Sequence, residues 1–411
     1  MPLTEKELLS FVVENLGDTQ TCFQAIAEFA RHNDAKILMH FFKQCHNIKL
    51  NAMEIAYQTI RALLENTGGG IKSVHQLYEE SGVSDILRGV YTIGEALLAF
   101  RDFDVERGEP LLRKGVHICH RRMRMFPSEK LADMGFFMQN AFLLECVNYP
   151  IAERFPKPSF EIVHRDLYES SPYTVFTISD SVYFRKYFAR FAGELREQCG
   201  NVNIFLMLVN PEDDVISRTK EYGGMTLAST KYSGRWMAEF CVSSRFMLAN
   251  DILNYVGGAT IFTDVDSKFP QGSAEILSKI SQYPLVLCDT GSLYPLLRID
   301  GAIQAVQPTG ETFSFFDAAS DFMREDFTRT GPIYAFDQMA LYRAVCLWKK
   351  KGLAVTEINS LIGGDKKFPK FFKLTEEDDV IPLGERKPLR TNNNYKPKGF
   401  RPDGRVIWEW I

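Results

Sequence analysis

GGATIFTDVDSKF, residues 257–269, joins a short apolar run to two aspartates that are separated by one valine. The run from Ala259 to Phe262 is rich in residues that favour strands, so it predicts a short buried β-strand. Asp264 and Asp266 follow directly after that strand. Two carboxylates at a strand end either bind a cation or belong to an ordinary turn. The rest of the chain decides between these two interpretations.

Length, composition and charge restrict the class of protein. The chain has 411 residues, which is long for a single domain and suggests two or three. Hydrophobic residues make up 45% of it and aromatic residues 13%, which is enough for sizeable cores. The net charge of -4 gives no general attraction to nucleic acid or to an anionic membrane. With no apolar window approaching ~20 residues and no signal-peptide pattern, we expect no membrane span and a cytoplasmic location.

Residues 1–150 are expected to form an all-α helical bundle or a short solenoid. Apolar residues recur there at helical spacing, as in the segment 23–30. Thr4 and Glu7 have the spacing of a capping box ahead of the first helical segment. Helix starts lie ~16 to 20 residues apart, which is the spacing of a tetratricopeptide-type repeat, but the diagnostic residues of that repeat do not recur in register.

The pattern changes after a proline-rich junction near residue 150. From there on, short apolar strands alternate with helical segments, which predicts an α/β domain with a mainly parallel sheet over 165–375. Ligands bind such sheets at the carboxyl ends of the strands, which is where Asp180, Asp264 and Asp266 are expected. The predicted strands are Tyr173–Ile178, Ile204–Val209, Ala259–Phe262 and Leu285–Cys288.

A second D-x-D pattern provides an internal control for the first. Asp102 and Asp104 are also separated by one residue, but they follow the helical run Ala96–Phe100 and lead into charged residues. We interpret this pair as a solvated helix end. The pair at 264 and 266 differs from it because it follows a predicted strand.

Several short motifs stand in a fixed order around Asp264 and Asp266. Arg245 lies nineteen residues before Asp264 in a helical stretch, and I-D-G-A-I at 299–303, D-Q-M-A-L at 337–341 and G-G-D-K-K-F-P at 363–369 follow. This order resembles the GT-A class of nucleotide-sugar glycosyltransferases, and especially its retaining, family-8-like branch. The resemblance covers roughly residues 171–370, with gaps.

The resemblance implies a GT-A fold and transfer of a sugar from a nucleotide-sugar donor. A UDP-sugar is the favoured donor, and the acceptor would be a glycan or a protein. Mn²⁺ or Mg²⁺ on Asp264 and Asp266 would bridge the two phosphates, because hard cations prefer carboxylate oxygens and offset the charge of the departing diphosphate.

The same resemblance assigns roles to individual residues. Asp337 would face the sugar or the acceptor, and Gln338 would support it. Thr177, Ser179 and Asp180 would contact the nucleoside, whereas positive side chains would stabilise the leaving phosphates. The residues implied in donor binding are Thr177, Ser179, Asp180, Arg245, Asp264, Lys366 and Lys367.

The histidines depart from the family pattern. A histidine near the late glycine-lysine segment usually supplies the third metal ligand in that family. All seven histidines of this chain precede Asp264, and the last of them is His164. Asp365 could replace the missing ligand, or the metal could be held more loosely.

Two other functional classes remain open. A haloacid-dehalogenase-type phosphatase also ends a strand on D-x-D, but that family continues with Gly-Thr, where this chain has Ser267 and Lys268. A helical interaction protein with a degenerate transferase domain is the second alternative, and the missing histidine favours it. The segment 376–411 is expected to be a tail that packs back on the fold, because its last residues, VIWEWI, are apolar.

Overall fold

The computed structural model describes the chain in ranges separated by gaps. These ranges are 4–15, 25, 28–29, 92, 95–123, 157–234, 237–291, 298–330, 336–362, 372, 395–400 and 406–410. The backbone divides into two compact units, one of Met1–Val147 with Thr391–Ile411 and the other of Asn148–Arg390. The predicted domain limits of 1–150, 165–375 and 376–411 stay predictions.

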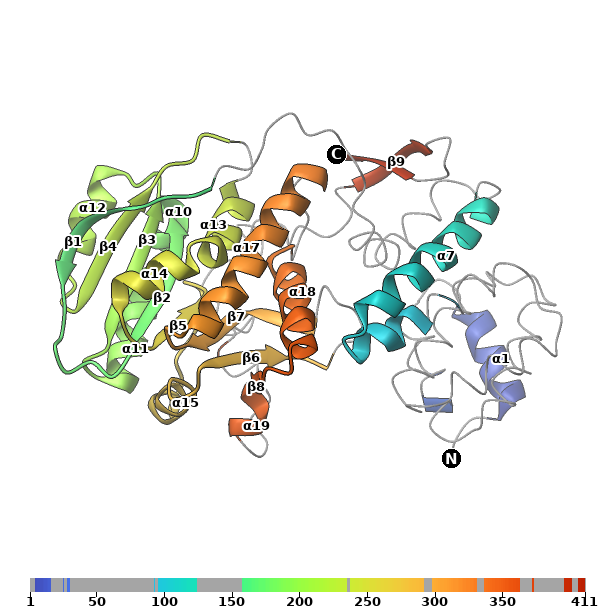
Figure 1. Ribbon diagram of the computed structural model, residues 1–411, viewed down its shortest axis with the longest axis horizontal. Helices are drawn as coiled ribbons and strands as arrows, with labels where there is room; N and C mark the ends of the chain where they lie inside the picture. The colour runs from blue at the N-terminus through green and yellow to red at the C-terminus, as the bar shows by residue number, and fades with distance from the viewer. Residues whose placement is uncertain are drawn as a thin grey trace. The chain divides into compact units, whose positions relative to one another are not determined.

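The first unit contains helices α1 (Glu5–Glu14) and α7 (Val105–Met123) and an antiparallel hairpin of β9 (Tyr395–Phe400) and β10 (Val406–Trp410) (Figure 1). The predicted capping box at the start of α1 is confirmed. Thr4 Oγ1 accepts a hydrogen bond from the backbone N–H of Glu7 at 3.3 Å, and Glu7 Oε2 accepts one from the N–H of Thr4 at 2.7 Å. Most of the predicted bundle or solenoid lies outside the described residues and stays a prediction.

The second unit is built on one sheet of eight strands in the order β1-β4-β3-β2-β5-β7-β6-β8. The four predicted strands are confirmed as β2, β3, β5 and β6, with ends that differ by at most two residues. The strands are β1 (Glu161–Asp166), β2 (Thr174–Asp180), β3 (Asn203–Val209), β4 (Met225–Thr230), β5 (Thr260–Thr263), β6 (Leu285–Asp289), β7 (Ile299–Val306) and β8 (Thr356–Glu357).

Strand direction explains where a ligand can bind. Strands β4, β3, β2 and β5 are parallel neighbours, whereas β7 is antiparallel to both β5 and β6. From β2 the chain runs outward through β3 to β4 and then returns to place β5 on the other side of β2. The carboxyl ends of β2 and β5 therefore flank a topological switch point, the place where open α/β sheets leave a crevice for ligands.

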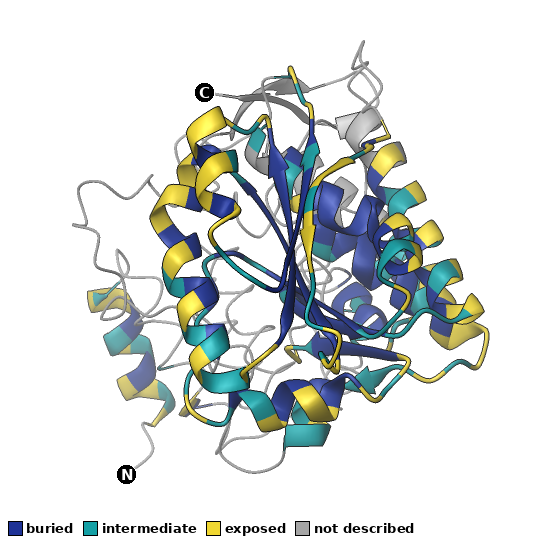
Figure 2. Cartoon of the chain, turned by 90° about the vertical axis from the view of Figure 1, so that its left-hand side faces the viewer, coloured by how far each residue is buried: buried dark blue, intermediate teal, exposed yellow. Residues whose placement is uncertain are grey.

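Helices cover both faces of the sheet. Figure 1 shows α13, α14, α17 and α18 together across one face, and Figure 2 shows buried strands between helices whose outer sides are exposed. The helices are α10 (Ser181–Tyr183), the π-helix η1 (Phe184–Phe188), α11 (Ala189–Cys199), α12 (Asp213–Thr219), α13 (Met237–Met247), α14 (Ala249–Val256), α15 (Ser273–Ile280), α17 (Gly310–Thr330), α18 (Phe336–Lys350) and α19 (Ile358–Ile362).

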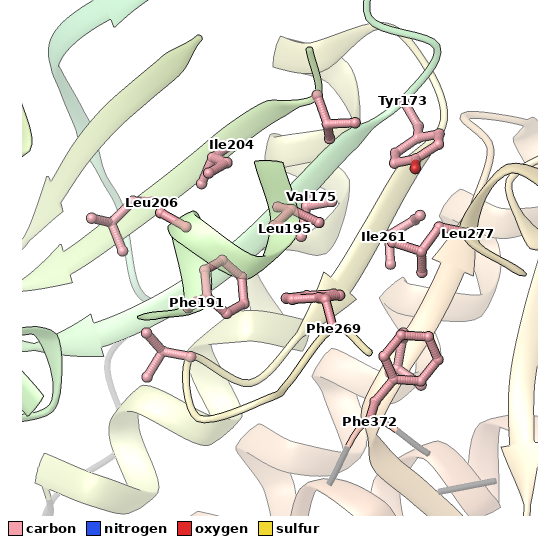
Figure 3. Close-up of a cluster of buried hydrophobic side chains, with 14 of the residues drawn as sticks. Tyr173, Val175, Phe191, Leu195, Ile204, Leu206, Ile261, Phe269, Leu277 and Phe372 are labelled. Carbon is pink, nitrogen blue, oxygen red and sulfur yellow. The ribbon is translucent and has the colours of Figure 1, made fainter. Parts of the chain in front are cut away.

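Successive residues of β5 point into different cores, because side chains alternate along a strand. Ile261 belongs to a cluster with residues of η1, α11 and α15, and there the ring of Phe191 meets that of Phe269 edge-on at 5.2 Å (Figure 3). Phe262 points the other way and stacks on Phe316 of α17 at 5.8 Å. The strand that leads to Asp264 is thus buried on both faces.

Within the described ranges, no helix has both the length and the apolar composition needed to cross a membrane.

Candidate functional site

The site begins where β2 ends. Asp180 is the last residue of β2 and caps α10, because its Oδ1 accepts a hydrogen bond from the backbone N–H of Tyr183 at 2.7 Å. Ser179 is buried and donates to the carbonyl of Asp180 at 2.9 Å. Thr177 is fully buried two residues further back, and its hydroxyl has no hydrogen-bond partner. Asp180 is therefore the residue of this predicted group that reaches the strand end.

Asp264 lies at the end of β5, next to the end of β2. Its Oδ1 accepts a hydrogen bond from Nη1 of Arg245 at 2.5 Å, while its side chain keeps 39% of its surface exposed. Its backbone N–H donates to the carbonyl of Ala302 in β7 at 3.3 Å. Asp264 is consequently fixed by two neighbouring elements and still faces solvent.

Asp266 is less exposed than its position in a loop suggests. The side chain is half-buried. Burial raises the pKa of its carboxyl above the ordinary range, and the nearby charge of Asp264 raises that pKa further. A hydrogen bond holds the loop that carries the two aspartates, since the hydroxyls of Thr263 and Ser267 are 2.9 Å apart. Asp264 and Asp266 therefore form a constrained pair of carboxylates.

Arg245 is one of the largest fully buried side chains in the described part of the protein, with 2% of its surface exposed. Its Nη1 bonds Asp264, and its Nη2 lies 3.7 Å from Oδ2 of Asp337. Its guanidinium also lies over the ring of Phe246, 4.6 Å from the centroid. The arginine predicted to sit beside the phosphates thus contacts two carboxylates from inside the protein.

Asp337 is the second residue of α18 and is buried beside Arg245. Burial raises the pKa of its carboxyl to about 6, against the opposing effect of the Arg245 charge. Gln338 follows it and is half-buried. A carboxyl held in this environment can accept hydrogen bonds from a ligand and can change protonation near neutral pH.

Gly301 in β7 forms the wall opposite Asp337. A Cβ atom at this position would stand 2.7 Å from Oδ2 of Asp337 and 3.4 Å from Nη2 of Arg245. Both groups are held in place by the ion pair, so neither can move aside freely. The missing side chain of Gly301 is therefore what lets β7 approach the two charged residues.

Tyr183 is a candidate site residue that the sequence motifs do not indicate. It is 36% exposed, and burial of its hydroxyl followed by the charge of Asp266 raises its pKa to about 12. Its ring lies 5.4 Å from that of Tyr187. The sequence offers one signal for Tyr183, namely an aromatic residue three positions after Asp180 in the first helical segment beyond β2. Tyr183 adds a partly exposed ring to the same strand ends.

The control pair of aspartates has a different environment. The side chain of Asp102 is 66% exposed. Oδ1 of Asp104 accepts a hydrogen bond from the backbone N–H of Arg107 at 3.1 Å at the start of α7. The prediction of a solvated helix end is confirmed for this pair.

The described residues fit a cation that brings some of its own ligands. No group of three or more His, Cys, Asp or Glu side chains that could hold a metal ion occurs among them. Asp264 and Asp266 nevertheless offer two carboxylates, and Mg²⁺ is commonly bound through one or two carboxylates together with substrate phosphates. Asp365, Lys366 and Lys367 lie outside the described residues.

We predict that Gly301→Ala lowers the free energy of unfolding by roughly 1–3 kcal/mol, because the added methyl group must displace Asp337 or Arg245. Urea denaturation measures the loss. Gly193→Ala in α11 is the matched control, since nothing lies within 4 Å of its Cβ. An alanine there should raise helix stability by up to about 1 kcal/mol. A neutral Gly301→Ala variant would contradict the close approach described above.

We also predict that the second unit is more stable at pH 5 than at pH 7. The pKa of Asp337 is about 6 in the folded protein and about 4 when unfolded. Its contribution is therefore complete below pH 4 and is lost as the pH rises through 6. Between pH 7 and pH 5 it should add about 1 kcal/mol. Urea titrations at both values should show a smaller difference for Asp337→Asn, and an equal difference would refute the assignment.

Comparisons with known proteins identify no family for this chain. No protein-family model matches the chain, and no curated protein matches it. Among solved structures, the chain is similar to the glycosyltransferase GlyE in Streptococcus pneumoniae TIGR4, with 11% identity and a TM-score of 0.32. The match covers 46% of this chain and 45% of that chain, so less than half of either protein is compared. A likeness of this size carries no argument about fold or activity.

Proposed function

We propose that the second unit transfers a sugar from a nucleoside-diphosphate donor to an acceptor. The observation that carries the proposal is the ion pair of Arg245 with Asp264 and Asp337 at the sheet's switch point. It joins a partly exposed carboxylate suited to a cation with a buried carboxylate suited to a reacting group. Both kinds of group are needed where a diphosphate leaves a sugar.

The diphosphate is assigned to the end of β5. Asp264 and Asp266 would hold Mn²⁺ or Mg²⁺ together with phosphate oxygens, and the bound cation would neutralise charge on the leaving diphosphate. Arg245 holds the Asp264 carboxylate in place by its hydrogen bond, so the carboxylate needs no reorganisation when the ligand binds. Lys366 and Lys367 are proposed to add positive charge beside the phosphates.

The nucleoside is assigned to the end of β2. Tyr183 presents a partly exposed ring on which a base can stack, and Asp180 supplies a polar group beside it. Ser179 is buried, and its proposed contribution is to support Asp180 through the hydrogen bond to its carbonyl. Thr177 is buried behind them, so its proposed contribution is to the packing beneath the nucleoside. We favour a UDP-sugar as the donor.

The sugar is assigned to the space between β7 and α18. Asp337 would accept hydrogen bonds from sugar hydroxyls and stabilise positive charge on the anomeric carbon as the diphosphate departs. Gln338 lies beside it. As the finer assignment we propose the GT-A class and its retaining branch, with a glycan or protein as the acceptor.

The phosphatase alternative requires an aspartate that attacks phosphorus. The hydrogen bond from Arg245 to Asp264 draws charge from that carboxylate and makes it a poorer nucleophile. The alternative of a degenerate domain requires that donor binding or turnover be absent. A thermal-shift screen of UDP-, GDP- and CDP-sugars with and without Mn²⁺ separates these cases, because a ligand of the native state raises the unfolding midpoint.

We predict that Asp264→Asn and Asp266→Asn each lower donor hydrolysis or transfer by about a hundredfold or more, through loss of charge on the diphosphate cation. The rate is measured by chromatography of the UDP that is released from UDP-sugars. Asp264→Asn also removes the partner of a buried arginine, so its unfolding midpoint is recorded alongside. Asp266→Asn is the cleaner variant.

Asp102→Asn and Asp104→Asn are the controls for that experiment. Asp102 is exposed, and asparagine caps a helix as well as the aspartate at 104 does. Both variants should turn over donor at the rate of the unmodified protein. Undiminished turnover in both Asp264→Asn and Asp266→Asn would refute the proposed function, and phosphate release from a sugar phosphate would favour the phosphatase.

We further predict that Asp337→Asn lowers kcat by about a hundredfold while UDP affinity changes less than about twofold. Asp337 pairs with Nη2 of Arg245, whereas Asp264 is bonded to Nη1, so the two carboxylates use different donors of the same guanidinium. Steady-state kinetics and calorimetric titration with UDP separate the two quantities. If UDP binding collapses while kcat is unchanged, Asp337 belongs to the nucleotide site instead.

A further inference from the structure

Two neighbouring turns at the carboxyl edge of the sheet are cross-linked beside the proposed nucleoside site. The first turn follows β2 and carries Ser181 and Tyr183, and the second follows β3 and leads into α12. Because β2 and β3 are parallel neighbours, both turns lie at the edge where Asp180 ends its strand. Oγ of Ser181 accepts a hydrogen bond from the backbone N–H of Glu212 in the second turn at 3.1 Å. This bond ties the start of α10 to the residue before α12.

Arg185 makes a second cross-link between the same two turns. It lies in the π-helix η1, two residues after Tyr183. Its Nη2 donates to Oε2 of Glu212 at 2.6 Å and to Oδ1 of Asp214 at 2.8 Å. Its Nη1 donates to Oε1 of Glu212 at 3.2 Å, and its Nε donates to Oδ2 of Asp214 at 3.3 Å. One guanidinium thus bonds both oxygens of each carboxylate, and we call Arg185, Glu212 and Asp214 the arginine clasp.

The arginine clasp lies at the surface of the protein. The side chain of Arg185 is 35% exposed, and those of Glu212 and Asp214 are 60% and 54% exposed. Exposed ion pairs contribute little to folding stability, because water screens the charges and the long side chains lose freedom. A planar guanidinium that donates from all three of its nitrogens, however, fixes direction as well as distance. The arginine clasp is therefore better suited to orienting the turn after β2 than to stabilising the fold.

Tyr183 lies between the two cross-links, with Ser181 two residues before it and Arg185 two residues after it. Its backbone N–H is held as well, since it donates to Oδ1 of Asp180 at 2.7 Å. Its ring stays partly exposed and lies 5.4 Å from that of Tyr187. Short π-helical segments such as η1 occur frequently at functional sites. The backbone of Tyr183 is thus fixed on both sides, while its ring remains accessible to a ligand.

We propose that Arg185 is a positioning residue whose clasp with Glu212 and Asp214 holds the turn that presents the Tyr183 ring to the base of the donor. The inference rests on the proposed function and extends it to a residue outside the assigned base, diphosphate and sugar contacts. An aromatic ring that is oriented before binding loses less freedom when a base stacks on it, so it binds the base more tightly. The rival explanation is that Arg185 attracts the diphosphate through its charge alone.

The first test needs no ligand. Amide hydrogen exchange of the segment 181–188 is measured in the unmodified protein, in Arg185→Met and in the double variant Glu212→Gln with Asp214→Asn. Both variants break the arginine clasp, so exchange in this segment should become about threefold faster or more, while helix α15 keeps its rate. Unchanged exchange across 181–188 in either variant would overturn the proposal, whether or not the protein binds a nucleotide.

The second test uses the fact that these variants change charge in opposite directions. Arg185→Met removes a positive charge, whereas Glu212→Gln with Asp214→Asn removes negative charge. Calorimetric titration with UDP should show about two- to tenfold weaker binding in both, because the Tyr183 ring must then be ordered at the moment of binding. If charge attraction alone acts, the acidic double variant should instead bind the UDP anion more tightly. Tighter or unaltered binding in that variant would overturn the proposal.

A third measurement connects the arginine clasp to Tyr183. Tyr183→Ala should weaken UDP binding by about tenfold or more through loss of stacking. Adding Arg185→Met to it should weaken binding no further, because no ring is left to orient. Steady-state kinetics of Arg185→Met should show a raised KM for the donor, with kcat within about twofold of the unmodified protein. Additive losses of UDP affinity, or a loss confined to kcat, would overturn the proposal.

Arg218→Met is the matched control for the UDP titration. Arg218 is exposed in the last turn of α12, so this variant removes the same charge from the helix that carries Asp214 and leaves the arginine clasp intact. Its UDP affinity should equal that of the unmodified protein, and a loss as large as that of Arg185→Met would overturn the proposal. Arg185→Lys should restore part of the affinity, because the charge is kept while the fork of donors is lost. Absence of UDP binding in the unmodified protein would instead contradict the proposed function, and the exchange measurement would still decide the role of Arg185.

Discussion

A buried arginine shared by two carboxylates is the interaction on which the rest of the site depends. A guanidinium taken out of water is tolerated only when nearby negative charge and hydrogen bonds offset its lost hydration. Arg245 obtains these from Asp264 at the end of β5 and from Asp337 at the start of α18. The three side chains therefore fix α13, β5 and α18 relative to one another. Gly301 completes the constraint, because any larger residue in β7 would enter the space between the two charges.

The order of the strands turns this cluster into an extended site. Strands β2, β5 and β7 are neighbours, with their site residues at one edge of the sheet. A ligand lying across this edge meets the ring of Tyr183 first, then Asp264 and Asp266, and then Asp337. An aromatic surface, a cation-binding pair and a buried carboxylate follow one another as the base, diphosphate and sugar of a nucleotide-sugar do. The order of chemical groups in the site therefore matches their order in a nucleotide-sugar, which supports the proposed function.

The sequence allowed the strands and the acidic pair to be predicted because their signals are local. The run before Asp264 consists of apolar residues and threonines, all of them buried in β5, and the pair at 102 and 104 lacks that context. The burial of Arg245 was not predictable in this way. Arginine is rarely buried, and its pairing depends on Asp337, which the fold brings from far along the chain. The role of Gly301 depends on the same distant contact. A single tyrosine after Asp180 is too weak a local signal to predict that Tyr183 belongs to the site.

The charges around the acidic pair favour joint binding of a cation and a diphosphate. Asp264, Asp266 and Asp337 together would repel a diphosphate that arrived without a cation. The two aspartates alone offer a divalent cation fewer oxygens than it prefers, and Arg245 already engages one of them. Phosphate oxygens supply the missing ligands, and the cation removes the repulsion. Under the proposed function, each partner therefore raises the affinity for the other, which is the reciprocal coupling that linkage requires.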